Sequence, residues 1–219
     1  MQHYDVPFYA NPDKTHCLQA CVRSTLKFFE PNNEYPWERL DKITDKIKGM
    51  STWPQRTLIN LSSMGYKTIL IESFDYKQFI LQGKDYLINE YGQVTANWQI
   101  KNSNIKKEQK DYIELLSSDA IIKNKEPLQK DIKTFLDSGY LVKATVNSKK
   151  LNNLPGYTGH SILIIGYDNN GLYVHDPGPI AQRNRYVLTN AFEQAWASPN
   201  IKAKELIAIK PKKKGFNNG

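Results

Sequence analysis

The stretch that decides the fold runs from residue 159 to residue 178 and reads GHSILIIGYDNNGLYVHDPG. It contains an apolar run from His160 to Tyr167, the tetrapeptide Asp-Asn-Asn-Gly at 168–171, and a second apolar run that ends at Asp176. Such a tetrapeptide between two apolar runs is typical of a tight turn between paired strands. We therefore predict an antiparallel hairpin in which His160 lies opposite a residue within one or two positions of Asp176.

Outward from this hairpin, the periodicity of apolar residues changes along the chain. Three-to-four-residue spacing predicts helices over 17–29, about 35–48, about 54–64 and 127–139. Short apolar runs predict strands over 66–72, 140–146, 185–188 and 206–209, and residues 189–196 fit a short helix. Because helices come first and strands mostly last, the fold class is predicted to be α+β rather than a doubly wound sheet.

The segment from about 73 to 125 has a weaker pattern. It contains short helical stretches, and residues 97–104 look like a loop because of their asparagines. We interpret this segment as an accessory helical insertion in a single domain over 1–209. Residues 210–219, which include Lys210 and Lys212–Lys214, are predicted to be a basic flexible tail.

Composition narrows the class of protein and its partners. The 219 residues carry a net charge of +8, but no basic and aromatic residues interleave in a nucleic-acid motif, so a nucleic-acid partner is not favoured. No apolar run approaches the length of a membrane span, so no membrane partner is expected. Two cysteines, four residues apart, suit a reducing compartment and predict a cytoplasmic protein. The oligomeric state is left open.

The candidate chemistry rests on Cys17, His160 and Asp176. Cys17 lies at a predicted helix start, where the helix dipole and free N–H groups favour a thiolate. An imidazole beside it can take the thiol proton and later give it to a leaving group. A carboxylate on the other ring nitrogen fixes the tautomer. Singly, each residue has an ordinary structural explanation, and only their combination points to nucleophilic catalysis.

Several motifs also resemble those of the bacteriocin-processing, double-glycine cysteine peptidases and their stand-alone relatives. The matching stretches are VPFY at 6–9, HCLQAC at 16–21, GYLV at 139–142, GHSILIIGYD at 159–168 and VHDPG at 174–178. The resemblance covers about 4–30 and 127–209. It implies a papain-like fold in which a helical half packs on a mostly antiparallel sheet. It also implies that Cys17 is the nucleophile, His160 the base and Asp176 the orienting carboxylate.

Two residues depart from that pattern. Leu18 stands where the family has glycine, and Asn11, six residues before Cys17, stands where the family has its oxyanion-hole glutamine. Asn11 has the same amide donor with a shorter reach, so we predict that it serves the oxyanion if its loop folds inward. Gln19 is an alternative donor. The structural alternative is that Asn11 only begins a turn with Pro12 and Asp13.

The sequence thus predicts a cysteine peptidase, or thiol hydrolase, that cleaves peptide or related amide bonds in a peptide or protein substrate. An acyltransferase with the same triad and a catalytically inactive papain-like binding module are the alternatives. A zinc site made by His16, Cys17, Cys21 and His160 is a further alternative, but the spacing of these residues is poor for a tetrahedral set. We expect no metal and no cofactor. The loop 156–159 is expected to border the substrate cleft.

Overall fold

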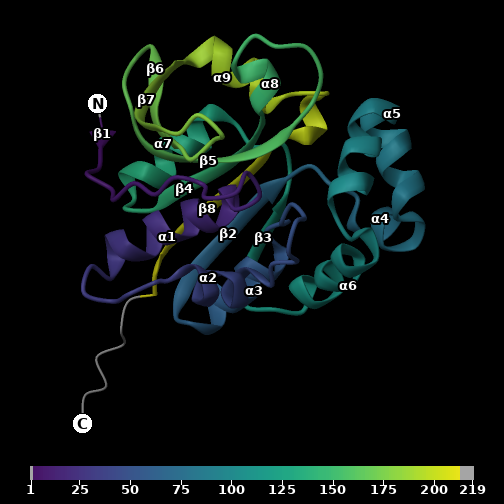
Figure 1. Cartoon of the computed structure of the whole chain (residues 1–219), viewed down its shortest axis with the longest axis horizontal. Helices are drawn as coiled ribbons and strands as arrows, with labels where there is room; N and C mark the ends of the chain where they lie inside the picture. Colours follow the sequence, from purple (N-terminus) through teal and green to yellow (C-terminus); the bar gives the residue numbers. More distant parts are fainter. Residues whose placement is uncertain (1, 213–219) are drawn as a thin grey trace.

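The computed structural model describes residues 2–212, which form a sheet covered by helices on both faces (Figure 1). The sheet order is β3-β2-β8-β4-β5-β6-β7, with β1 paired to β5. All of these pairings are antiparallel except that of β2 with β3. The strands are β1 Gln2–His3, β2 Tyr66–Glu72, β3 Ile121–Asn124, β4 Leu141–Asn147, β5 Gly159–Tyr167, β6 Gly171–Asp176, β7 Gln182–Leu188 and β8 Glu205–Pro211.

The helices divide between the two faces and one side of the sheet. They are α1 Cys17–Phe29, α2 Trp37–Thr44, α3 Gln55–Ser63, α4 Tyr76–Gln82, α5 Lys84–Asn102, α6 Ile105–Leu116, α7 Gln129–Asp137, α8 Ser148–Leu151, α9 Thr189–Trp196 and a 3-10 turn at Ile201–Ala203. The predicted helix over 17–29 and the predicted strand over 66–72 have the bounds that the structure gives them.

Each face of the sheet has its own hydrophobic core, because side chains alternate along a strand. On one face, Leu18 and Leu26 of α1 pack with Leu70 of β2 and Ile207 of β8. On the other face, α7 and α9 cover residues of β4, β5 and β8, and Trp196 is fully buried there. A fully buried leucine contributes about 1.5–3 kcal/mol, so the leucine stripe on α1 holds the start of that helix against the sheet.

The insertion is helical as predicted, but it is also part of the main fold. Helices α4, α5 and α6 lie together beside the sheet, whereas β3 extends the sheet by pairing with β2 (Figure 1). Phe74 and Tyr112 stack with ring centroids 5.0 Å apart and anchor these helices. The predicted loop over 97–104 is wrong, since α5 continues to Asn102 after an irregular turn at Gly92, where φ is 76°.

The predicted boundary of the basic tail also differs from the structure. Strand β8 continues through Lys210 and Pro211, which pair with Lys67 and Tyr66 of β2. The Lys212 backbone N–H then donates to the Gly65 carbonyl at 2.8 Å. The rest of the predicted tail, residues 213–219, lies outside the described residues.

Within residues 2–212 there is no helix with the length and apolar character needed to cross a membrane.

Candidate active site

The loop before Cys17 is held by side chains that bind backbone groups. The Asn11 Oδ1 accepts the His16 backbone N–H at 3.0 Å and the Asp13 backbone N–H at 3.3 Å. The His16 ring bonds Asp13 and Asp41 through its two nitrogens, at 2.6 and 3.1 Å. Helix α1 then begins at Cys17. This fixed loop presents the thiol at the N-terminus of a helix, where free N–H groups favour negative charge.

The hairpin holds His160 and Asp176 together. Strand β5 pairs with β6 so that Leu163 lies opposite His175, which puts Asp176 across from the start of β5. The His160 Nε2 lies 2.7 Å from the Asp176 Oδ1. The other carboxylate oxygen accepts the Arg185 guanidinium at 2.8 Å. Because Nε2 is occupied by the carboxylate, Nδ1 is the ring nitrogen available to the Cys17 thiol.

The electrostatics of this pair favour an ionised thiol. Burial raises the pKa of Cys17, but the neighbouring His160 imidazole opposes it, and the pKa settles at about 7. Burial lowers the pKa of His160, whereas its hydrogen bonds to Asp176 and Cys17 raise it, to about 9. Asp176 keeps a lowered pKa against the effect of burial because it binds His160 and Arg185. Thiolate and imidazolium therefore coexist near neutral pH.

The neighbouring positions have structural surroundings. Cys21 is buried among Val6, Leu141 and Leu163, and burial together with the nearby Cys17 charge raises its pKa well above the usual value. Leu18, the departure from glycine, is buried in the core against α3 and β8. Leu18 is thus accommodated in the core, and α1 begins at Cys17 with Leu18 in its first turn.

The two candidate amide donors differ in what they already bind. Gln19 is fully buried, and its Nε2 donates to Thr44 at 2.8 Å and to Thr52 at 2.9 Å, so neither hydrogen is left for an oxyanion. Gln19 is therefore excluded as the alternative donor. The Asn11 Oδ1 stabilises the turn, as the structural alternative predicts. No hydrogen bond from its Nδ2 is found within residues 2–212, and its oxyanion role stays a prediction.

The alternative zinc site is not assembled. His16 is turned to Asp13 and Asp41, and Cys21 is enclosed by apolar side chains. Within the described part of the chain, no three His, Cys, Asp or Glu side chains are grouped so that they could hold a metal ion. The residues proposed as zinc ligands therefore serve separate local structures.

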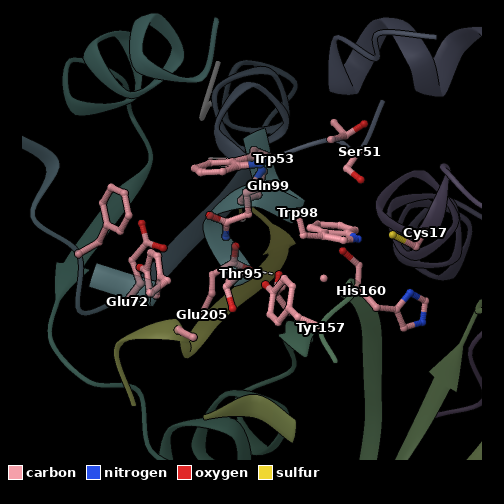
Figure 2. A pocket seen from close by; sticks show the side chains of 18 of the residues that line it. Cys17, Ser51, Trp53, Glu72, Thr95, Trp98, Gln99, Tyr157, His160 and Glu205 are labelled. Carbon is pink, nitrogen blue, oxygen red and sulfur yellow. Dashed lines mark hydrogen bonds between the residues drawn. The ribbon is translucent and has the colours of Figure 1, made fainter. Parts of the chain in front are cut away.

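A cavity of about 120 Å³ begins at Cys17 and His160 (Figure 2). We call this the thiol end. Tyr157 and Gly159, from the loop expected to border the cleft, line the cavity. Trp98 of α5 packs edge-on against Tyr157, with ring centroids 5.5 Å apart. The insertion therefore forms one wall of the cavity, which sequence reasoning missed because it treated 97–104 as a loop.

The opposite end of the cavity holds Glu72 and Glu205 (Figure 2), with Lys143 bonded to the Glu205 carboxylate, and we call it the carboxylate end. Glu72 lies opposite Glu205 in the sheet, Glu205 opposite Thr145, and Thr145 opposite Ser161. These residues therefore form one row across four strands, leading from the residue after His160 to Glu72. The sequence contains one signal for this end of the cavity: Glu72 is a charged residue that directly follows the apolar residues Ile69–Ile71 of a predicted strand.

The sequence and the fold of this chain are both similar to those of known proteins. The profile of the Peptidase_C39 like family matches residues 3–201. The chain belongs to this C39-like family. Among solved structures, it is similar to the peptidase domain of Streptococcus ComA, a bi-functional ABC transporter involved in a quorum sensing pathway. That match has a TM-score of 0.50 and 15% identity, and covers 95% of this chain and 99% of that one.

A putative C39-like peptidase from Bacillus anthracis is also similar, with a TM-score of 0.49, 14% identity, and coverage of 96% of this chain and 98% of that one. No curated protein matches the chain in sequence. The family match over residues 3–201 confirms the predicted family, and the likeness to the ComA peptidase domain confirms the predicted α+β, papain-like fold class.

Proposed function

We propose that this C39-like chain is a cysteine peptidase that cleaves a peptide or related amide bond through Cys17, His160 and Asp176. The Cys17 thiolate attacks the substrate carbonyl, and the His160 imidazolium gives its proton to the departing amine. A water, deprotonated by His160, then releases the acyl group from sulfur. Asp176 keeps the ring oriented throughout.

One observation carries the proposal: Cys17, at the start of α1, lies beside an imidazole whose Nε2 is held 2.7 Å from Asp176. This arrangement gives the nucleophile a base and gives the base an orienting carboxylate. We assign the two oxyanion donors to the backbone N–H of Cys17, which is in the first turn of the helix, and to the Asn11 side chain. The cytoplasmic location stays a prediction.

The test compares the two cysteines. Cys17→Ala should abolish cleavage of a mixed peptide library, measured by mass spectrometry of the products, because the nucleophile is lost. Cys21→Ala should keep cleavage and instead lower the melting temperature, because Cys21 fills part of the core. Full cleavage by the Cys17→Ala protein would remove the triad assignment.

The alternatives give different results in the same assay. An acyltransferase would form the same acyl-enzyme but pass the acyl group to an added amine faster than to water. A non-catalytic binding module would show no cleavage and no faster alkylation of Cys17 than of Cys21 by iodoacetamide. The triad geometry and the lowered pKa of Cys17 support the peptidase over the binding module.

A further inference from the structure

The carboxylate end of the cavity has an unbalanced charge. Lys143 Nζ bonds the Glu205 carboxylate at 2.5 Å, and Lys202, on the cavity wall, pairs with Glu90 at 2.8 Å. Within residues 2–212, no cation pairs with Glu72, whose Oε1 accepts only the Tyr112 hydroxyl at 3.1 Å. Glu72 is only 7% exposed and lines the cavity. Ionising a buried carboxyl without a partner is costly, so Glu72 can carry its charge at little cost only when a cation joins it at this end of the cavity.

Neighbouring polar atoms point to the same kind of ligand. The Gln55 Oε1 and the Gln99 Oε1 are buried without a hydrogen-bond partner, and both residues line the cavity. Figure 2 shows Gln99 between Glu72 and the thiol end, with Trp53 nearby. Unpaired acceptors that share one cavity with a carboxyl group and aromatic side chains suit a ligand that carries several N–H donors and a positive charge.

The size of the cavity fits a long side chain. A single water molecule needs a cavity volume of about 10–15 Å³. The cavity volume of about 120 Å³ is therefore enough for a side chain of several heavy atoms. The row from Ser161 to Glu72 crosses three strand spacings, or about 14 Å. An extended arginine or lysine side chain covers about half of that distance, and one or two backbone residues cover the rest.

We propose that the carboxylate end is a subsite for the lysine or arginine side chain of a peptide substrate, placed within two residues of the bond that Cys17 attacks. This inference rests on the proposed function for the attacked bond, but the cation-binding part can be measured without cleavage. Glu72 is the specificity-determining residue, and the helical insertion contributes Gln99 to the cavity wall between Glu72 and the thiol end.

The experiment uses a peptide series, acetyl-Ala-Ala-X-Ala-Ala-Ala-amide, in which X is arginine, lysine, citrulline or norleucine. Citrulline has the shape of arginine without its charge. Binding to the Cys17→Ala protein is followed by tryptophan fluorescence, because Trp53 and Trp98 line the cavity. The arginine peptide should bind about 10- to 100-fold more tightly than the citrulline peptide, the range expected of a hydrogen-bonded charge.

The matched variants are Glu72→Gln and Glu108→Gln, each combined with Cys17→Ala. Glu108 is also a buried glutamate, 4% exposed on α6, but it does not line the cavity. Glu72→Gln should abolish the preference for arginine over citrulline, and Glu108→Gln should keep it. Thermal unfolding of both variants checks that each is folded.

The results separate this inference from the proposed function. An arginine preference that needs Glu72, with no cleavage of any peptide by the wild-type protein, supports the subsite and contradicts the peptidase. Cleavage without any preference for basic residues contradicts the subsite and supports the peptidase. Equal or absent binding of the arginine and citrulline peptides, or a preference that survives Glu72→Gln, would overturn the inference.

Discussion

The two ends of the cavity differ in how their charges are balanced. At the thiol end, His160 lies between Cys17 and Asp176, and Arg185 binds the other oxygen of the Asp176 carboxylate. Each charge there has a partner. At the carboxylate end, Lys143 neutralises Glu205 while Glu72 has no cation within the described residues. The paired groups of the thiol end are charged in the free protein, whereas burial holds Glu72 mostly protonated near neutral pH, and a cationic ligand would let it ionise. We therefore assign the reaction to the thiol end of the cavity and the recognition of the substrate to the carboxylate end.

The largest effect is expected at the thiol end, from Asn11. Asn11→Asp keeps the Oδ1 acceptor for the His16 and Asp13 N–H groups but removes the amide donor. If the amide binds the oxyanion, turnover should fall about 10²- to 10³-fold with little change in substrate binding, as measured by kcat and KM on a cleaved library peptide.

Asn11→Ala is the companion variant, because it removes both the donor and the turn contacts. It should lose the same turnover and also lower the melting temperature. Unchanged turnover in Asn11→Asp would assign Asn11 to the turn alone. The catalytic groups of the thiol end would then be the three residues of the triad without the Asn11 amide.

The next effect concerns pH. Because the pKa of Cys17 is about 7 and that of His160 about 9, the rate of Cys17 alkylation by iodoacetamide in the Cys21→Ala protein should rise about tenfold per pH unit below 7 and level off above it. Peptide cleavage should follow the same lower limb and fall above pH 9, where the imidazolium proton is lost.

Asp176→Asn sharpens this test. Removing the carboxylate removes a cause of the raised pKa of His160, so the alkaline limb should move to lower pH. A limb that stays in place would mean that Asp176 does not set the charge on His160.

The smallest effect is on stability at the carboxylate end. Burial, and then the nearby Glu205 charge, raise the pKa of Glu72 to about 8, while Lys143 opposes them. Its folded pKa is thus above the unfolded value, and the wild-type protein loses stability as pH rises from about 4.5 through 8. Glu72→Gln should therefore be as stable as wild type at pH 4 and more stable at pH 9, by up to a few kcal/mol in urea unfolding.

A stability difference that is the same at pH 4 and pH 9 would show that folding does not raise the pKa of Glu72, so that its carboxylate is ionised in the folded protein without a burial cost. The charge imbalance between the two ends of the cavity would then disappear, and with it the reason to expect a cationic ligand.

The thiol end was predictable because its signals are local. Cys17 begins a clear apolar periodicity, and the turn at 168–171 fixes which strand lies beside His160. The carboxylate end was not predictable, because Glu72 and Glu205 are brought together by strands far apart in the sequence. No short motif encodes that register.

The wall of the cavity was missed for a different reason. In α5, Gly92 has a positive φ and breaks the helix, and the apolar residues after it do not keep to one face, so Val94 is exposed while Ala96 is buried. Periodicity therefore failed at Trp98 and Gln99. The structure recovers them because α5 packs against the loop before His160, where a side chain at Gly159 would meet Trp98 at 3.1 Å.

Strand β8 has a consequence for how the molecule is assembled. It lies between β2 and β4, yet it follows every other strand in the chain. Until it forms, the sheet is two separate ribbons with open edges, one carrying Glu72 and the other carrying Lys143 and His160. Pairing at such long sequence separation is slow. The two halves of the cavity are therefore joined through β8 alone, and the spacing between Glu72 and His160 depends on the register of β8 with both neighbours.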